Sequence, residues 1–334
     1  MKKYKQTPHC TRPQGAAVVK ALVLIAIFLL NTCNNGLNGL LELQREMFPV
    51  RNYEELLDAV NGAPDDGQPR VIGVVNDIIL NSFIEIGDEK NITLTAFDSV
   101  VYITSTIAMK DANFFYIEDG GSLTLGDKRG RGTLILDGGK DNSRIKPLIT
   151  VGSSLIPSAA LIMNNMVILQ NNIINASGGA VSLNYNSIFI MNGGIIRDNH
   201  AKDSCYGGGI YMADAVFTIN GGEIINNSAE NYGGGIYMVD AIINMNGGTI
   251  TGNTANAGGG GVFVGSGARL SVFTMKGGKI FGNNPLSDKN NIYIGAFNSG
   301  QQISASIFGT SYFINFGDPA LECNHPIPPA PDYP

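Results

Sequence analysis

A repeat of 26 to 30 residues in the second half of the chain restricts the possible folds more than any other feature. One glycine-rich block recurs at residues 178–181, 207–210, 233–236 and 259–262. A second block, Asn-Gly-Gly or Lys-Gly-Gly, recurs at residues 192–194, 220–222, 246–248 and 276–278. An asparagine follows five residues after the second glycine of each second block. Such self-similarity is typical of solenoids, in which each repeat packs only on its neighbours.

Two segments of each repeat alternate between apolar and other residues with a period of two. The first and third positions of residues 210–212, 236–238, 262–264 and 292–294 are aliphatic or methionine. The second segment contains the apolar pairs Phe189 and Met191, Phe217 and Ile219, Ile243 and Met245, and Phe273 and Met275. A third apolar position holds Ile196, Ile224, Ile250 and Ile280. A period of two predicts strands with one buried face.

Three short strands and three turns per repeat predict the coil of a parallel β-helix. Stacked coils bury the apolar face that one coil leaves exposed, and the glycine blocks fit tight corners. One column of asparagines is predicted to form a ladder of side-chain amides: Asn171, Asn199, Asn227, Asn253 and Asn283. A helical solenoid is excluded because the repeats show no 3.6-residue period and Gly-Gly-Gly would break each helix.

The first half of the chain continues the strand pattern without the regular repeat. Strands are predicted at 71–75, 78–86, 91–95, 100–103, 122–125 and 133–136. Residues 52–60 are predicted to form a short amphipathic helix that caps the first coil, with Asn52 as N-cap. We therefore expect one all-β domain over 49–323, with irregular coils at 70–158 and regular coils at 161–295. A linker at 33–48 precedes it, and a proline-rich tail at 324–334 follows.

Residues 1–32 are predicted to be a signal peptide. They contain five basic residues and no acidic ones, and the apolar run 21–30 has the length of a signal-peptide core. Leu30 to Cys33 resembles a lipoprotein processing site, so Cys33 is a candidate for lipidation; ordinary cleavage nearby or an uncleaved anchor are the alternatives. We expect export to the cell surface or outer membrane, or secretion. Export also leaves open a disulfide between Cys205 and Cys323.

The charge of the remaining chain argues against some partners. Of the 22 basic residues, 17 follow the signal peptide, against 28 acidic residues, which gives a net charge of −11. Binding of nucleic acid or anionic lipid requires a basic face. We therefore expect no nucleic-acid partner, and contact with a membrane only through the leader or a lipid anchor.

Two families share these patterns. Residues 49–136 resemble the N-terminal coils of pectin-lyase-like right-handed β-helix proteins. Residues 161–295 resemble the repeats of chlamydial polymorphic outer membrane proteins, which pair a GGAI-type block with an FxxN-type block. Here isoleucine replaces the phenylalanine, only the block at 178–181 keeps the alanine, and the chain ends in a proline-rich tail instead of a barrel. The resemblance implies a right-handed parallel β-helix, whereas function has to be argued from sites.

A carbohydrate-active enzyme, either a lyase or a hydrolase, is the main alternative to a binding protein. Asp214 and Asp240 share one repeat position and would lie on adjacent coils, where they either bridge a calcium ion or are solvated turn residues. We favour the second interpretation. Arg144-Ile145-Lys146 is similar to a triplet of polygalacturonases, but their paired-Asp and GHG motifs are missing, so 137–146 is predicted to be a surface loop. The sequence predicts no catalytic residues and no cofactor.

An aromatic row is the stronger candidate for function. Tyr211, Tyr237, Phe263 and Tyr293 occupy the outward position of one strand in successive coils. Such a strip can stack on sugar rings or contact a partner protein; alternatively, it only stabilises the sheet. The sequence thus predicts a non-enzymatic, adhesin-like surface protein that binds glycans or host or surface proteins, with a purely structural surface protein as a further alternative.

Overall fold

The structure, a computed structural model, describes side chains for residues 47–118, 120–126, 132–140, 144–152, 159–265, 267, 269–283 and 291–295. It describes only the backbone of 143, 302–307, 310–315 and 321–323. The predicted signal peptide, Cys33, the predicted linker up to residue 46 and the predicted tail at 324–334 lie outside the described residues, so export and lipidation stay predictions. Within the described ranges, no helix has the length and apolar character needed to cross a membrane.

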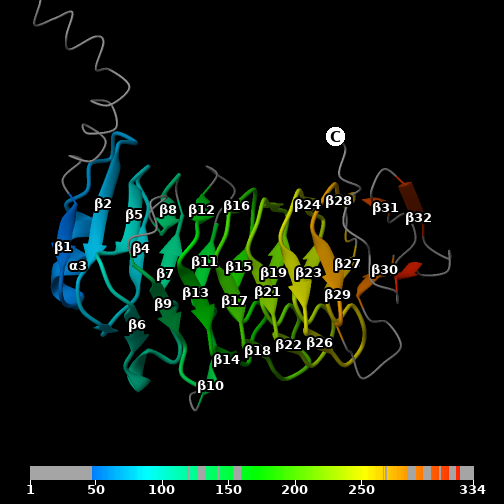
Figure 1. Cartoon of the computed structure of the whole chain (residues 1–334), viewed down its shortest axis with the longest axis horizontal. Coiled ribbons are helices and arrows are strands. Elements are labelled where there is room, and N and C mark those ends of the chain that lie inside the picture. Colours follow the sequence, from blue (N-terminus) through cyan, green and yellow to red (C-terminus); the bar gives the residue numbers. More distant parts are fainter. Residues whose placement is uncertain are drawn as a thin grey trace, which may run out of the picture. The chain divides into compact units, whose positions relative to one another are not determined.

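The described residues from Phe48 onward form a parallel β-solenoid of about eight coils (Figure 1). The first sheet contains β1 (Phe48–Val50), β2 (Pro69–Val74), β5 (Asn91–Ala96), β8 (Ser122–Leu125), β12 (Ala160–Met163), β16 (Ile188–Met191), β20 (Val216–Ile219), β24 (Ile242–Met245), β28 (Ser271–Met275), β31 (Gln302–Ile307) and β32 (Thr310–Asn315). The second sheet contains β3 (Ile78–Leu80), β6 (Val101–Ser105), β9 (Leu134–Asp137), β13 (Val167–Gln170), β17 (Ile195–Arg197), β21 (Glu223–Ile225), β25 (Thr249–Thr251) and β29 (Lys279–Phe281).

Two further sheets complete each coil. The third sheet contains β4 (Ile84–Ile86), β7 (Phe115–Ile117), β11 (Ile149–Val151), β15 (Val181–Leu183), β19 (Ile210–Ala213), β23 (Ile236–Val239), β27 (Val262–Gly265), β30 (Ile292–Ile294) and β33 (Leu321–Cys323). The fourth consists of two-residue strands: β10 (Ser143–Arg144), β14 (Ile173–Ile174), β18 (His200–Ala201), β22 (Ser228–Ala229) and β26 (Thr254–Ala255). The sequence pattern predicts three strands per coil, and this short fourth strand follows the asparagine corner.

The strand register reproduces the sequence repeat. Ile210 pairs with Ile236, and Ile236 pairs with Val262, so equivalent residues 26 positions apart lie on neighbouring strands. The described strands pair in parallel except at the C-terminal end, where β32 pairs antiparallel with β31 and β33 pairs antiparallel with β30. The prediction of an all-β parallel β-helix is confirmed.

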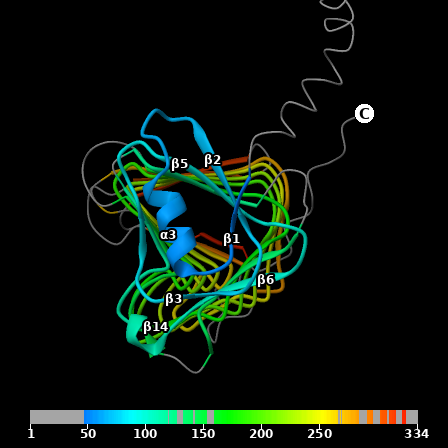
Figure 2. The same ribbon diagram turned by 90° about the vertical axis from the view of Figure 1, so that its left-hand side faces the viewer.

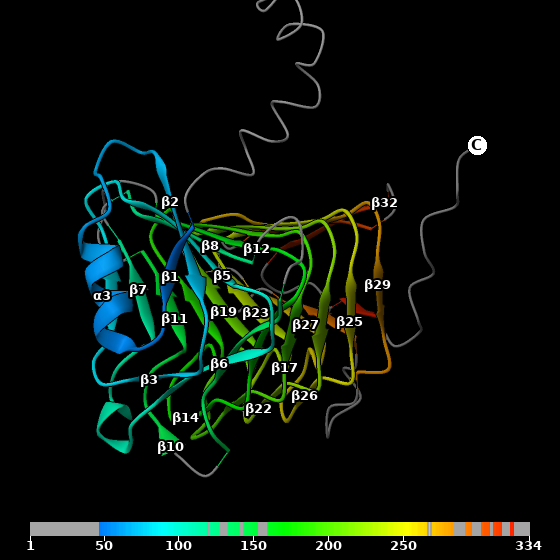
Figure 3. The same ribbon diagram turned by 60° about the vertical axis from the view of Figure 1, so that its left-hand side comes forward.

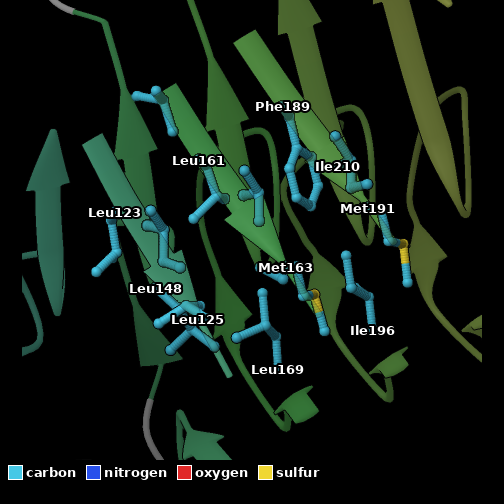
Figure 4. Close-up of a cluster of buried hydrophobic side chains, with 14 of the residues drawn as sticks. Leu123, Leu125, Leu148, Leu161, Met163, Leu169, Phe189, Met191, Ile196 and Ile210 are labelled. Atoms are coloured by element: carbon cyan, nitrogen blue, oxygen red, sulfur yellow. The ribbon is translucent and has the colours of Figure 1, made fainter. Parts of the chain in front are cut away.

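The core fills the inside of the coils with columns of apolar side chains (Figure 4). Leu123, Leu161 and Phe189 lie on successive strands of the first sheet and are fully buried. Phe217 continues this column, and its ring stacks on that of Phe189 with a centroid distance of 4.6 Å. Complete burial of such a side chain stabilises the fold by about 1.5–3 kcal/mol, so stacking of coils supplies the stability that one coil lacks.

The predicted N-terminal cap is helix α3 (Tyr53–Asn61). Its N-cap is Asn52, whose Oδ1 accepts a hydrogen bond from the backbone N–H of Glu55 at 2.8 Å. Leu56 and Val60 are buried against the first coil, and α3 lies across the end of the solenoid (Figures 2 and 3). The helix therefore covers apolar surface that a preceding coil would otherwise cover.

Arg144 contradicts the prediction that 137–146 is a surface loop. It pairs in register with buried Ile174 and is itself only 1% exposed. Its guanidinium donates to Ser105 Oγ at 2.6 Å and to the carbonyl oxygen of Ala112, and it lies over the ring of Phe114. Burial lowers the pKa of Arg144 to about 10, although Asp111 opposes this shift. Because β10 directs this side chain inward, the hydrogen bonds of Arg144 to Ser105 and Ala112 connect neighbouring coils inside the solenoid.

Candidate functional site

The predicted asparagine ladder is present from Asn199 onward. The side-chain nitrogen of Asn199 donates to Oδ1 of Asn227 at 2.9 Å, and Asn227 and Asn253 repeat this bond toward Asn253 and Asn283 at 3.0 Å. Each acceptor oxygen also receives the backbone N–H of the preceding asparagine. Asn283 in turn donates to Asn291. These side chains are buried, so the ladder holds the coils together from inside.

The prediction that Asn171 belongs to this ladder is wrong. Leu169, not Ile168, pairs with Ile196, so the register is shifted by one residue in this coil. The ladder position is therefore Asn172, whose backbone N–H donates to Oδ1 of Asn199 at 3.1 Å. Asn171 has a φ of 59° and donates from its side chain to Asp137 at 2.9 Å.

The structure contains a second asparagine ladder, which the sequence analysis did not predict. It joins the first residue of each Asn-Gly-Gly block to the preceding coil, through bonds of 3.0 Å from Asn192 to Asn164, from Asn220 to Asn192 and from Asn246 to Asn220. The next block has Lys276 at this position. The recurrence of asparagine beside the glycine pair is the signal from which this ladder could have been predicted.

The predicted aromatic row is present on the outer face of the third sheet. The rings of Tyr211 and Tyr237 stack at a centroid distance of 5.5 Å and an interplanar angle of 4°. Tyr237 and Phe263 stack at 5.0 Å, and Phe263 and Tyr293 at 5.4 Å. We call these four side chains the inner row. Their regular stacking follows from the parallel register, which places each ring above the next.

A second row of aromatic side chains covers part of the first. Tyr206 and Tyr232 come from the glycine-rich corners before β19 and β23, and we call them the outer row. The Tyr206 ring lies 4.6 Å from that of Tyr237, and the Tyr232 ring lies 4.5 Å from that of Phe263. The available signal for this row is a tyrosine directly before each of two Gly-Gly-Gly blocks.

The expectation of a strip open over four coils is therefore only partly correct. Phe263 is completely buried and Tyr293 is 8% exposed, whereas Tyr206, Tyr211, Tyr232 and Tyr237 are partly exposed. Tyr232 lies against both Phe263 and Tyr293, which accounts for part of this burial. Within the two rows, the accessible aromatic surface is concentrated on these four tyrosines.

Charged residues adjoin this aromatic surface. Asp214 and Asp240 follow β19 and β23, both with φ of 52°. Asp214 accepts from Nη1 of Arg269 at 2.7 Å, and Asp240 accepts from the backbone N–H groups of Gly267 and Arg269. The two aspartates thus share one repeat position, as predicted, but Arg269 contacts both of them. The two side chains are partly exposed turn residues, as favoured above, and they are also hydrogen-bonded.

The phenol groups of Tyr211 and Tyr237 stay protonated across the physiological range. Burial raises the pKa of Tyr211, and nearby Tyr206 and Asp240 raise it further. The pKa of Tyr237 is also raised, mainly by burial and then by Tyr211 and Tyr206. The hydroxyl groups of both residues can therefore donate hydrogen bonds.

A histidine cluster lies on the fourth sheet. Nδ1 of His200 is hydrogen-bonded to Ser228 Oγ, and Nε2 lies 3.8 Å from a carboxylate oxygen of Glu230. The pKa of His200 is lowered, mainly by burial and further by Lys202, while Glu230 opposes the shift. The backbone N–H of Ser228 donates to the carbonyl oxygen of Asn199, so this group does not serve an oxyanion. The cluster thus places a serine hydroxyl and a carboxylate beside the two ring nitrogens of one histidine.

Acidification is expected to weaken the fold through His200. Because its pKa in the folded chain lies below the ordinary value of 6.5, the unfolded chain binds the proton more readily. The contribution to the free energy of unfolding is complete above pH 6.5 and declines as the pH falls below it. Urea unfolding of wild type and His200→Gln at several pH values checks this: the variant should lose stability less steeply, and equal slopes would contradict the assignment.

The remaining candidates give no further site. Cys205 is a free cysteine, and burial raises the pKa of its thiol. The side chain of Cys323 lies outside the described residues. In the part of the chain that the structure describes, no three His, Cys, Asp or Glu side chains are grouped as metal ligands. Comparison with models of protein families, with curated proteins and with solved structures found no match.

Proposed function

We propose that this protein is an exported, non-enzymatic surface protein that binds carbohydrate through the tyrosines of the inner and outer rows. The observation that carries the proposal is the gathering of Tyr206, Tyr211, Tyr232 and Tyr237 on one face, all partly exposed. Sheet stability alone accounts for the inner row, because its rings lie on paired strands. It does not account for Tyr206 and Tyr232, which lie outside the strands and add a second layer of rings.

Sugars suit this surface because of its mixed chemistry. A pyranose ring has an apolar face of C–H groups that packs on aromatic rings and a rim of hydroxyl groups that form hydrogen bonds. The protonated hydroxyls of Tyr211 and Tyr237 supply donors beside the rings, and Asp240 is close enough to shift the pKa of both. Rigid tyrosines also lose little conformational entropy on binding.

The enzymatic alternative has less support. Two carboxylates of a glycosidase must be available to the substrate, one as acid and one as base or nucleophile. Asp214 is instead paired with Arg269 at 2.7 Å, and Asp240 is held by two backbone N–H groups. A binding function requires no such pair, so it is the better account of this face.

Removal of the Tyr211 ring is expected to weaken glycan binding about tenfold, which corresponds to about 1.4 kcal/mol. The measurement is binding of the full chain to an array of oligosaccharides, followed by titration of each glycan that binds. The matched control is Tyr102→Ala, because Tyr102 is an outward tyrosine on the second sheet and is 38% exposed. Loss of binding in Tyr211→Ala but not in Tyr102→Ala supports the proposal. An array without any bound glycan, or equal binding by both variants, contradicts it.

A further inference from the structure

Both aromatic rows end at the same coil. In the inner row, the position before Tyr211 is occupied by Ser182 on β15, its register partner. In the outer row, the position before Tyr206 is occupied by Ser177, whose hydroxyl accepts the backbone N–H of Tyr206 at 3.2 Å. A tyrosine is thus replaced by a serine twice, side by side. We call the surface over Ser177 and Ser182 the serine step.

The serine step leaves one face of Tyr211 without an aromatic neighbour in the row. Tyr237 is stacked between two rings, with Tyr211 at 5.5 Å on one side and Phe263 at 5.0 Å on the other. Tyr211 stacks on Tyr237 with an interplanar angle of 4°, so its opposite face is directed toward the coil of Ser182. Both faces of Tyr237 are used by neighbouring rings, whereas Tyr211 presents a face to the step.

The outward row is polar over the next two strands, while Tyr185, in the turn after β15, is an exposed aromatic side chain near Tyr211. Beyond Ser182 the outward row continues with Thr150 on β11 and reaches the next aromatic ring at Tyr116 on β7. With strands about 4.8 Å apart, Tyr211 and Tyr116 are about 14 Å apart along the stack. Asn184 donates to Ser182 Oγ at 3.2 Å, and Asn113 donates to Thr150 Oγ1 at 2.8 Å. Both hydroxyls therefore keep their own hydrogen for donation to a ligand.

We propose that a neutral hexopyranose unit binds in the serine step, with its apolar face stacked on the face of Tyr211 that is directed toward Ser182. Its hydroxyl groups are hydrogen-bonded by Ser182 and Thr150. This inference rests on the proposed carbohydrate function and adds the position of the sugar and its charge class. The sugar takes the place in the stack that a further tyrosine ring would occupy.

The charges around the step select against acidic sugars. Glu85 follows Tyr116 in the same outward row, and Asp214 and Asp240 lie at the turns after β19 and β23. Arg269 is the cation beside these aspartates, and it is bonded to Asp214. A uronate would add a further negative charge near these carboxylates, and like charges repel. Neutral hexoses and N-acetylhexosamines carry no such penalty.

Ser182→Tyr tests the position of the sugar. Tyrosine stands at the equivalent outward position in the next two coils, so the strand should tolerate it, and the new ring would fill the step. We expect at least a tenfold loss of affinity for neutral probes, namely cellohexaose, chitohexaose and galactohexaose. A matched change, Ser177→Tyr, fills the step from the outer row and should have the same effect. Circular dichroism and thermal unfolding of both variants check that the solenoid remains folded.

The outcomes separate this inference from the proposed function. If Ser182→Tyr and Ser177→Tyr, both folded, bind as tightly as wild type or tighter while Tyr211→Ala loses binding, the rows bind sugar along their length and the serine step is wrong. Tighter binding of oligogalacturonate than of the neutral probes overturns the charge class. If wild type binds none of these probes and no glycan on the array, both the inference and the proposed function fail.

Discussion

Gly234→Ala is expected to destabilise the fold by about 3 kcal/mol or more, although it adds only one methyl group. A Cβ at this position would lie 2.2 Å from the carbonyl oxygen of Thr254 and 2.5 Å from that of Gly260. Both are backbone atoms of the next coil, so neither can move without breaking hydrogen bonds between coils. The free energy of unfolding in urea, measured for wild type and Gly234→Ala, gives the difference.

Gly67→Ala is the matched control for this prediction. Gly67 has a φ of 73°, but a Cβ there would meet no atom within 4 Å. Only the backbone penalty of about 1 kcal/mol is expected. Gly234, unlike Gly67, has no positive φ, so its loss is expected from the close approach of coils alone, and a similar loss in both variants would contradict the prediction.

Loss of one buried ladder amide should have the second largest effect. Asn227→Ala removes the acceptor for both the side chain and the backbone N–H of Asn199, and the donor to Asn253. Buried polar groups left without partners cost about 1–3 kcal/mol each, so we expect a loss of about 3 kcal/mol in the free energy of unfolding. Urea unfolding monitored by circular dichroism checks this value.

The second ladder supplies a control with the same chemistry. Asn220 also links two neighbouring asparagines at 3.0 Å, but it is exposed to solvent, which replaces a lost hydrogen bond. Asn220→Ala should therefore cost about 1 kcal/mol or less. If both variants lose the same stability, burial does not determine the strength of the ladders.

The fold was predictable because each strand residue pairs with the residue one repeat length further along the chain, so the repeat length sets the strand register. A spacing of 26 residues between Ile210 and Ile236 is both a repeat length and a pairing of neighbours. Where the repeat is irregular, the prediction is weaker: the glycines that mark the frame are missing from the coil of Asn171, so the sequence does not distinguish it from Asn172. The pairing of Leu169 with Ile196 makes this distinction.

Features that depend on side-chain direction at corners were harder to predict. A charged residue in a loop is usually solvated, and nothing local shows that Arg144 pairs in register with a buried isoleucine. The outer row was also not predicted. Tyr206 and Tyr232 lie outside the strands, where the alternation of apolar and polar residues does not show which way a side chain points. The serine step is recognisable only when the positions of both rows are known.

The repeat also makes the length of the solenoid adjustable. Residues 210–235 and 236–261 each provide one complete coil, with the same glycine corner, the same ladder asparagine and the same outward tyrosine. After a tandem duplication or deletion of 26 residues in this region, each coil would still pack on neighbours with the same strand register and core positions. Evolution can therefore lengthen or shorten the inner row by one ring at a time, without remodelling either end.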